Sequence, residues 1–248
     1  KKNILLLSLF YFLFCNTGFS QNITIKGKIQ KPIVNSQSSE SESLVRLLTF
    51  NDMLTLEQTK IFETKADNEG NFIIEANIDE ITLAQIAVDL ERADILLKPN
   101  ATYEVEINIP EQDANSSYFE RQSPTIKIIK ADDDNLYYQY HMSEMIIDDF
   151  LLNNFNQLYR GRNISLLDNI DIEIANNLGE IKSDFVKDNI RYRKAAMQMI
   201  ANNDNGKKVI SQHFNKNDIL YSQPAYMNLF QEAFANYLSS NQFPPSEL

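Results

Sequence analysis

The sequence predicts an α+β protein in which an N-terminal antiparallel β-sandwich is followed by an all-helical region. Between residues 22 and 130, short runs alternate apolar and polar residues with period two, and Asn, Asp, Gly, Pro and Ser separate these runs. After residue 131, the apolar residues recur at helical steps instead. With 248 residues, of which 43% are hydrophobic, the chain has enough apolar material to form cores in both parts.

Each expected strand is a short run rich in β-branched or aromatic residues. In the first run, over residues 22–30, Ile23, Ile25 and Ile29 lie on one face. The runs recur about every ten residues, which is typical of an antiparallel sandwich. Polar loops are expected at 35–43 and 110–124. The other expected strands are residues 44–50, 59–66, 71–78, 83–90, 94–99, 102–109 and 125–130.

The polar segment DNEGN at residues 67–71 is expected to be a hairpin turn, because Asn, Asp and Gly tolerate positive φ. Asp67, Glu69 and Asn71 also have the alternating spacing of calcium ligands. A calcium loop needs a bidentate Glu at its far end, where this chain has Ile78. The turn is therefore the preferred interpretation.

The aspartates at 132–134 are expected to cap the first helix, because carboxylates complement the positive end of a helix. This helix should end at Gly161. Its apolar stripe consists of Leu136, Tyr140, Ile147, Leu151 and Leu158.

A second helical segment is expected from 165 to about 201, with Gly179 as a candidate break. Its apolar stripe consists of Ile170, Ile174, Leu178, Ile181 and Phe185. A short helix over 207–214 follows. Pro224 suits the first turn of a final helix, which is expected to bury Tyr226, Phe230, Phe234 and Tyr237.

The N-terminus has the pattern of a secretory signal peptide. Two lysines precede an apolar run over residues 4–15, which is shorter than the roughly 20 residues of a spanning helix. Cleavage is expected near Ser20. Lipidation at Cys15 is a weaker alternative because Phe14 is bulky, and an uncleaved anchor is another. The predicted location is the periplasm or cell envelope of a bacterium, and no spanning helix is expected in the mature chain.

Composition and motifs argue against several functions. The net charge of −11 makes nucleic acid a poor partner. Cys15 is the only cysteine, so the mature chain would contain no thiolate nucleophile. His141 and His213 are the only histidines, and no phosphate loop or Gly-x-Ser-x-Gly elbow accompanies them. We therefore expect no catalytic, cofactor-binding or metal-binding residue, although paired carboxylates of a glycosidase stay a distant alternative.

The basic cluster RYRK at 191–194 lies within the second helical segment. It is expected to pair with neighbouring carboxylates such as Asp184 and Asp188. The aromatic residues of the final helix are expected to pack in a core, and a groove for a partner is the alternative interpretation.

The segments DFVKDNIRYRKAAMQM, at 184–199, and NDILYSQPAYMNLFQEAFANYL, at 217–238, resemble the helical region of exported bacterial thioredoxin-like (TlpA-type) disulfide reductases. The sandwich, with its DNEGNF turn and the segment LLKPNATYEVEI, is similar to the small N-terminal domains of those proteins, which are of the carboxypeptidase-regulatory or transthyretin-like type. The residues that match the family pattern, as packing positions, are Tyr221, Pro224, Tyr226, Met227, Phe230, Phe234 and Tyr237.

The resemblance implies a non-catalytic accessory region that positions a redox domain or binds partner proteins. The Cys-x-x-Cys pair and the thioredoxin domain of the family do not occur in this sequence. The alternative is a stand-alone cell-envelope module that binds a glycan, a peptide or a protein. The expected divisions are a signal peptide at 1–20, a sandwich domain at 21–130, a helical domain at 131–240, and a linker or tail at 241–248.

Overall fold

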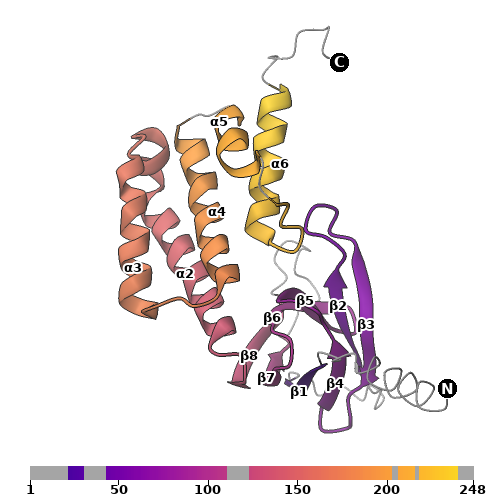
Figure 1. Ribbon diagram of the computed structural model, residues 1–248. Coiled ribbons are helices and arrows are strands. Elements are labelled where there is room, and N and C mark those ends of the chain that lie inside the picture. The colour runs from indigo at the N-terminus through magenta and orange to yellow at the C-terminus, as the bar shows by residue number, and fades with distance from the viewer. Residues whose placement is uncertain (1–21, 31–42, 111–122, 203–205, 216–217, 240–248) are drawn as a thin grey trace, which may run out of the picture.

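The computed structural model describes residues 22–30, 43–110, 123–202, 206–215 and 218–239 (Figure 1). The expected signal peptide, most of the two polar loops and the expected tail at 241–248 lie outside these residues. Within them, two four-stranded β-sheets are followed by a helical region, which confirms the predicted α+β class.

Every expected strand forms, and together the strands make a sandwich of two sheets. The first sheet has the order β4 (Asn71–Asn77), β1 (Asn22–Gln30), β7 (Thr102–Asn108) and β8 (Thr125–Ala131). The second has the order β3 (Gln58–Lys65), β2 (Leu44–Phe50), β5 (Thr82–Val88) and β6 (Glu91–Leu97).

The strand pairing is antiparallel with one exception. β1 lies between β4 and β7 and pairs with β7 in parallel, with Ile25 opposite Tyr103. The expected antiparallel sandwich therefore forms, with one parallel pair that the sequence pattern did not predict. The chain returns to both sides of β1 only after completing other strands, and alternation along a strand does not encode which neighbour it will meet.

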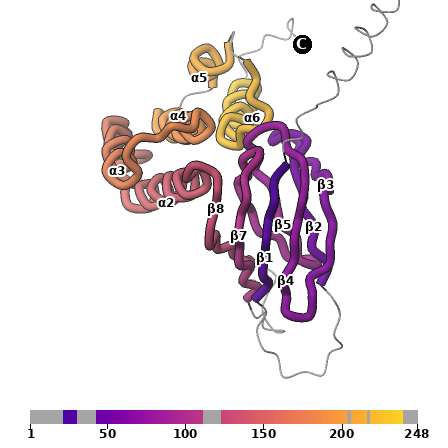
Figure 2. Tube along the Cα trace, turned by 60° about the horizontal axis from the view of Figure 1, so that its bottom comes forward, coloured from indigo at the N-terminus to yellow at the C-terminus, as the bar shows by residue number. Residues whose placement is uncertain are grey.

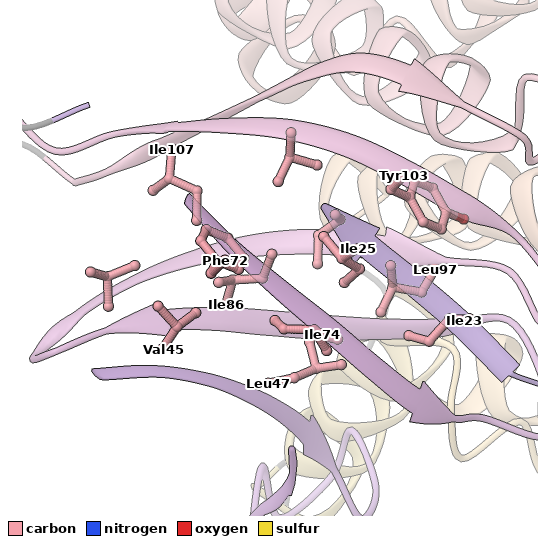
Figure 3. Close-up of a cluster of buried hydrophobic side chains, with 14 of the residues drawn as sticks. Ile23, Ile25, Val45, Leu47, Phe72, Ile74, Ile86, Leu97, Tyr103 and Ile107 are labelled. Atoms are coloured by element: carbon pink, nitrogen blue, oxygen red, sulfur yellow. The ribbon is translucent and has the colours of Figure 1, made fainter. Parts of the chain in front are cut away.

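The sandwich core lies between the inward faces of the two sheets (Figure 3). Period-two alternation turns one side of each strand inward, and the labelled residues come from both sheets. Gly27 has a specific place here. A Cβ at that position would lie 2.0 Å from the ring of Phe72, so the ring fills the space that a larger residue would need. The labelled residues are Ile23, Ile25, Val45, Leu47, Phe72, Ile74, Ile86, Leu97, Tyr103 and Ile107.

The turn at 67–71 joins two different sheets, so the predicted hairpin is wrong. β3 belongs to the second sheet and β4 to the first. The local chemistry is nevertheless that of a tight turn. The Asp67 carboxylate accepts hydrogen bonds from the backbone N–H groups of Glu69 and Asn71, and Gly70 has a φ of 83°. The side-chain amide of Asn71 also donates to this carboxylate, and this bond contributes most to lowering the pKa of Asp67. The backbone hydrogen bonds lower the pKa further.

The helices follow the predicted stripes. The four longer helices are α2 (Leu136–Phe155), α3 (Asp168–Leu178), α4 (Asp184–Ala201) and α6 (Pro224–Ser239). A π-helical turn at Asn156–Arg160 continues α2, and a 3₁₀ turn at Ile164–Leu167 precedes α3. The short helix α5 (Lys207–Val209) continues as a π-helical turn at Ile210–Phe214. Gly179, with a φ of 63°, ends α3, and Pro224 begins α6, as expected.

Asp133 forms hydrogen bonds with the first turn of α2. Its carboxylate accepts the N–H of Tyr137 at 2.9 Å, and its carbonyl oxygen accepts the N–H of Leu136 at 3.1 Å. Asp134 forms an ion pair with Lys98 instead, and this pair lowers the pKa of Asp134. One aspartate of the three therefore satisfies a backbone N–H in the first turn from outside the cap position, while its neighbour joins the helix start to the end of β6.

The helical region packs against the second sheet at two places. Leu96 of β6 and Leu83 of β5 lie in a cluster with residues of α2, α3 and α4. The loop between β2 and β3 reaches α6 (Figures 1 and 2), where the amide of Gln231 donates to the carbonyl oxygen of Leu54 at 2.9 Å. Contacts at two separated points fix the orientation of the helices on the sandwich.

Candidate binding groove on the helical region

The helical region carries an open groove of about 550 Å³ between α3 and α4. Both helices pack against α2, which leaves the groove between them. Its apolar lining comes from Ile174, Ala175, Ile181, Ile190 and Ala195. Its polar lining comes from Asp171, Lys187, Arg191, Lys194, Gln198 and His213.

One face of α4 forms a wall of this groove. Positions 187, 190, 191, 194, 195 and 198 follow the helical period, so the sequence itself places them on one side. The face is about 16 Å long at 1.5 Å per residue. This length matches about three turns of a helix, which makes the groove large enough for an amphipathic segment.

The cations at the groove are paired with carboxylates. Lys187 lies 3.1 Å from Asp184, and Arg191 lies 2.9 Å from Asp188, both at helical i, i+3 spacing. Lys194 reaches across the groove to Asp171 on α3. The groove therefore has an apolar floor and a rim of balanced charge, which does not select strongly for an anion.

The predicted pairing of the basic cluster is confirmed for Asp188 and corrected for Asp184. Asp184 pairs with Lys187, which is one turn away, rather than with the cluster at 191–194. Arg193, on another side of α4, contacts Asp148 and Glu144 of α2. The cluster thus joins three helices, an arrangement that sequence spacing within one helix did not reveal.

The structure places the two histidines in different hollows. His213 lines the groove, and its ring meets the ring of Tyr192 edge-on at 5.9 Å. Burial, together with the charge of Arg191, lowers the pKa of His213. His141 instead stacks on Tyr137 near β8. Among the described residues, no group of three or more potential metal ligands occurs.

The family-pattern residues lie at the junction of α6 with the rest of the molecule, but their environments differ. Tyr226 is buried and meets the rings of Tyr192 and Phe214 edge-on, each at 5.0 Å. Met227 is also buried, whereas Tyr221 is 54% exposed. Tyr221 contributes through its backbone, since its carbonyl oxygen accepts the N–H of Met53 at 2.9 Å.

The predicted burial on α6 holds for Tyr226 and needs correction elsewhere. Phe230, Phe234 and Tyr237 are half-buried, while Leu229 and Ala233 are fully buried. The small residues Ala233 and Gly206 let α6 approach the start of α5 closely, since a Cβ at Gly206 would lie 2.0 Å from the carbonyl oxygen of Ala233. Phe214 joins the rings of α6, at 5.4 Å from Phe230. Sequence reasoning missed Phe214, because a short helix with one aromatic residue carries no periodic signal.

A scan against protein-family models and a search of curated proteins find no match to this chain. Within the residues that the structure describes, no helix is both long and apolar enough to cross a membrane.

Proposed function

We propose that the chain is a non-catalytic accessory region of an exported thioredoxin-like disulfide reductase. In this proposal the sandwich and the helices act as one unit that positions a redox domain or holds partner proteins. The observation that carries it is the position of the segment 221–237. This segment, on which the family resemblance rests, forms the contact between the helices and the loop after β2.

The contact supports the proposal because a positioning unit must be rigid. Met53 is buried in one cluster with Tyr192, Met199 and Tyr226, and backbone hydrogen bonding to Tyr221 reinforces it. An apolar cluster with a hydrogen bond holds two parts in a fixed orientation better than a linker does. The resemblance therefore coincides with one of the two contacts that join the helices to the sandwich.

Reading the gene beyond Leu248 tests this proposal directly. We expect an open frame that encodes a thioredoxin fold with a Cys-x-x-Cys pair. An immediate stop codon, with no redox domain encoded alongside, would contradict it. Export is tested separately by sequencing the N-terminus of the protein recovered from the native cell envelope, where the first residue should be Gln21.

A stand-alone envelope module for a glycan, peptide or protein is the second candidate, and the α3–α4 groove favours it. Ala175 is exposed on the groove wall, so Ala175→Trp should fill the groove without disturbing the core. Ala235, exposed on α6, provides the matched control Ala235→Trp.

Thermal-shift measurements against envelope glycans and peptides test this second candidate. A ligand of the groove should stabilise the unmodified protein and the Ala235→Trp variant, but not the Ala175→Trp variant. Failure of every compound to stabilise the unmodified protein, or equal stabilisation of both variants, would contradict binding in the groove.

A further inference from the structure

β8 is an edge strand of the first sheet, and β6, the edge strand of the second sheet, comes close to part of it. β8 lies at the end of the order β4-β1-β7-β8, and in the described part of the chain it pairs with β7 alone. Figure 2 shows it on the side of the sandwich from which α2 departs. A hollow of about 460 Å³ follows this edge, lined by residues 126–131, by Asp133 and Asn135, and by Tyr137, Tyr138 and His141 of α2. The carboxylate of Asp133 is buried and accepts the N–H of Tyr137, so it is not presented to a ligand. A free strand edge beside a hollow is the geometry that accepts an additional strand.

The hollow also offers apolar contacts to the side chains of an added strand. The pairing of β7 with β8 shifts between Glu104 and Val105, so Ile129 has no residue opposite it and is 51% exposed. Tyr138 is 54% exposed on the neighbouring helix. Alternate residues of an extended segment would meet these side chains, since successive residues of a strand point to opposite sides.

Charged residues on the outer face of the sheet form two rows across the strands. Lys28 of β1 lies opposite Glu106 of β7, which lies opposite Lys127 of β8. The second row runs from Lys26 through Glu104 to Lys130. Each row alternates in sign and ends at the open edge with a lysine. Because of the bulge, Lys127 and Lys130 lie opposite Glu106 and Glu104, which are two residues apart on β7. The two lysine side chains therefore project from the same face of the sheet.

From these observations we infer that β8 binds an extended acidic segment of a partner protein as a fifth strand of the sheet. Carboxylates at two alternate positions of that segment would continue both rows beyond Lys127 and Lys130. A second copy of this chain is a poor occupant, because antiparallel pairing of β8 with itself brings lysines near lysines, which is unfavourable. The inference goes beyond the proposed function and requires no redox domain.

The test uses a blocked eight-residue peptide, Ac-TVEVEVTT-amide, whose two glutamates occupy alternate positions. Calorimetry should show binding to the purified chain, and hydrogen exchange should show new protection of amides in β8. Replacing both glutamates by lysine should weaken binding more than about ten-fold, because attraction becomes repulsion. N-methylation of alternate peptide amides should abolish binding, because it blocks pairing of strands.

Two double variants, each lacking two positive charges, distinguish an effect of the lysines at the β8 edge from an effect of the net charge of the protein. Lys127→Gln with Lys130→Gln should weaken binding about five-fold, as expected from two exposed ion pairs. Lys26→Gln with Lys28→Gln makes the same charge change on β1 and should leave affinity within about two-fold. Circular dichroism checks that both variants are folded.

Several results would overturn the inference. Absence of peptide binding, equal loss in the two double variants, or full binding of the N-methylated peptide would each do so. Protection of helix amides in place of β8 would also overturn it. Protection of β8 that depends on protein concentration without any peptide would identify a second copy as the occupant.

Discussion

The backbone N–H of Met53 donates a 2.9 Å hydrogen bond to the carbonyl oxygen of Tyr221, and the side chain of Met53 is buried in the same region. A loop of the sandwich and the turn before α6 are thus joined by both polar and apolar contacts. Two parts that differ in secondary structure are held together by a residue that sequence analysis did not single out.

Met53→Ala should weaken this junction. Truncation removes a buried side chain from the cluster that contains Tyr192 and Tyr226, at a cost of about 2–5 kcal/mol in the free energy of unfolding. Urea denaturation followed by circular dichroism measures this loss. Leu54→Ala changes the next residue, which is exposed, and should cost no more than about 0.5 kcal/mol. Equal effects of the two substitutions would contradict a specific role for Met53.

The hydrogen bond between Asn189 of α4 and Glu144 of α2, 2.7 Å long, should contribute more than an exposed ion pair. Asn189 is buried and its partner is charged, so a double-mutant cycle with alanine should give a coupling of about 1.5 kcal/mol. The same cycle on the exposed pair Lys187 and Asp184 should give about 0.5 kcal/mol or less. A larger coupling for the exposed pair would refute this ranking.

Gly206→Ala should be more destabilising than Gly179→Ala. Both glycines have positive φ, so both substitutions introduce backbone strain of about 1–3 kcal/mol. A Cβ at Gly206 would in addition lie 2.0 Å from the carbonyl oxygen of Ala233 in α6, whereas a Cβ at Gly179 meets nothing within 4 Å. Thermal unfolding of the two variants checks the difference. Equal melting temperatures would show that Gly206 and Ala233 are not in close contact.

Acidification should destabilise the fold through His213. Its pKa is lowered in the folded state by burial and by Arg191, so the unfolded chain binds the proton more readily. The stabilising contribution is therefore complete above the unfolded pKa of about 6.5 and is lost as the pH falls toward the lower folded value. Denaturation at pH 7.5 and pH 5.5 should show a smaller difference for His213→Gln than for the unmodified chain. An unchanged difference in the His213→Gln variant would contradict this role of His213.

The sequence predicted local structure more fully than it predicted the assembly of that structure. Alternation placed Ile23 and Ile25 on the buried face correctly, and the structure buries both completely. The turn at Asp67 has the expected chemistry, yet the strands that it joins lie in separate sheets. Local hydrogen bonds determine the shape of a turn, whereas sheet membership depends on residues far away in the chain.

The candidate site was predictable in its parts and not in its arrangement. The apolar stripe of Ile174 and Ile181 and the basic cluster at 191–194 were both visible in the sequence. That the two helices stand apart, with Lys194 reaching Asp171 across the space between them, depends on how both pack against α2. A periodic pattern reports which side of a helix is apolar, and it does not report how far away the next helix lies.

The position of β1 has a consequence for the order in which the protein acquires its shape. Both neighbours of this strand, β4 and β7, are synthesised after it, and β7 begins only at Thr102. Among the described strands β1 leaves the ribosome first, and it must wait unpaired until β4 at Asn71–Asn77 has followed, while hairpins such as β2 with β3 can close at once. Growth of the nascent chain, rather than any single contact, sets the moment at which the first sheet becomes complete.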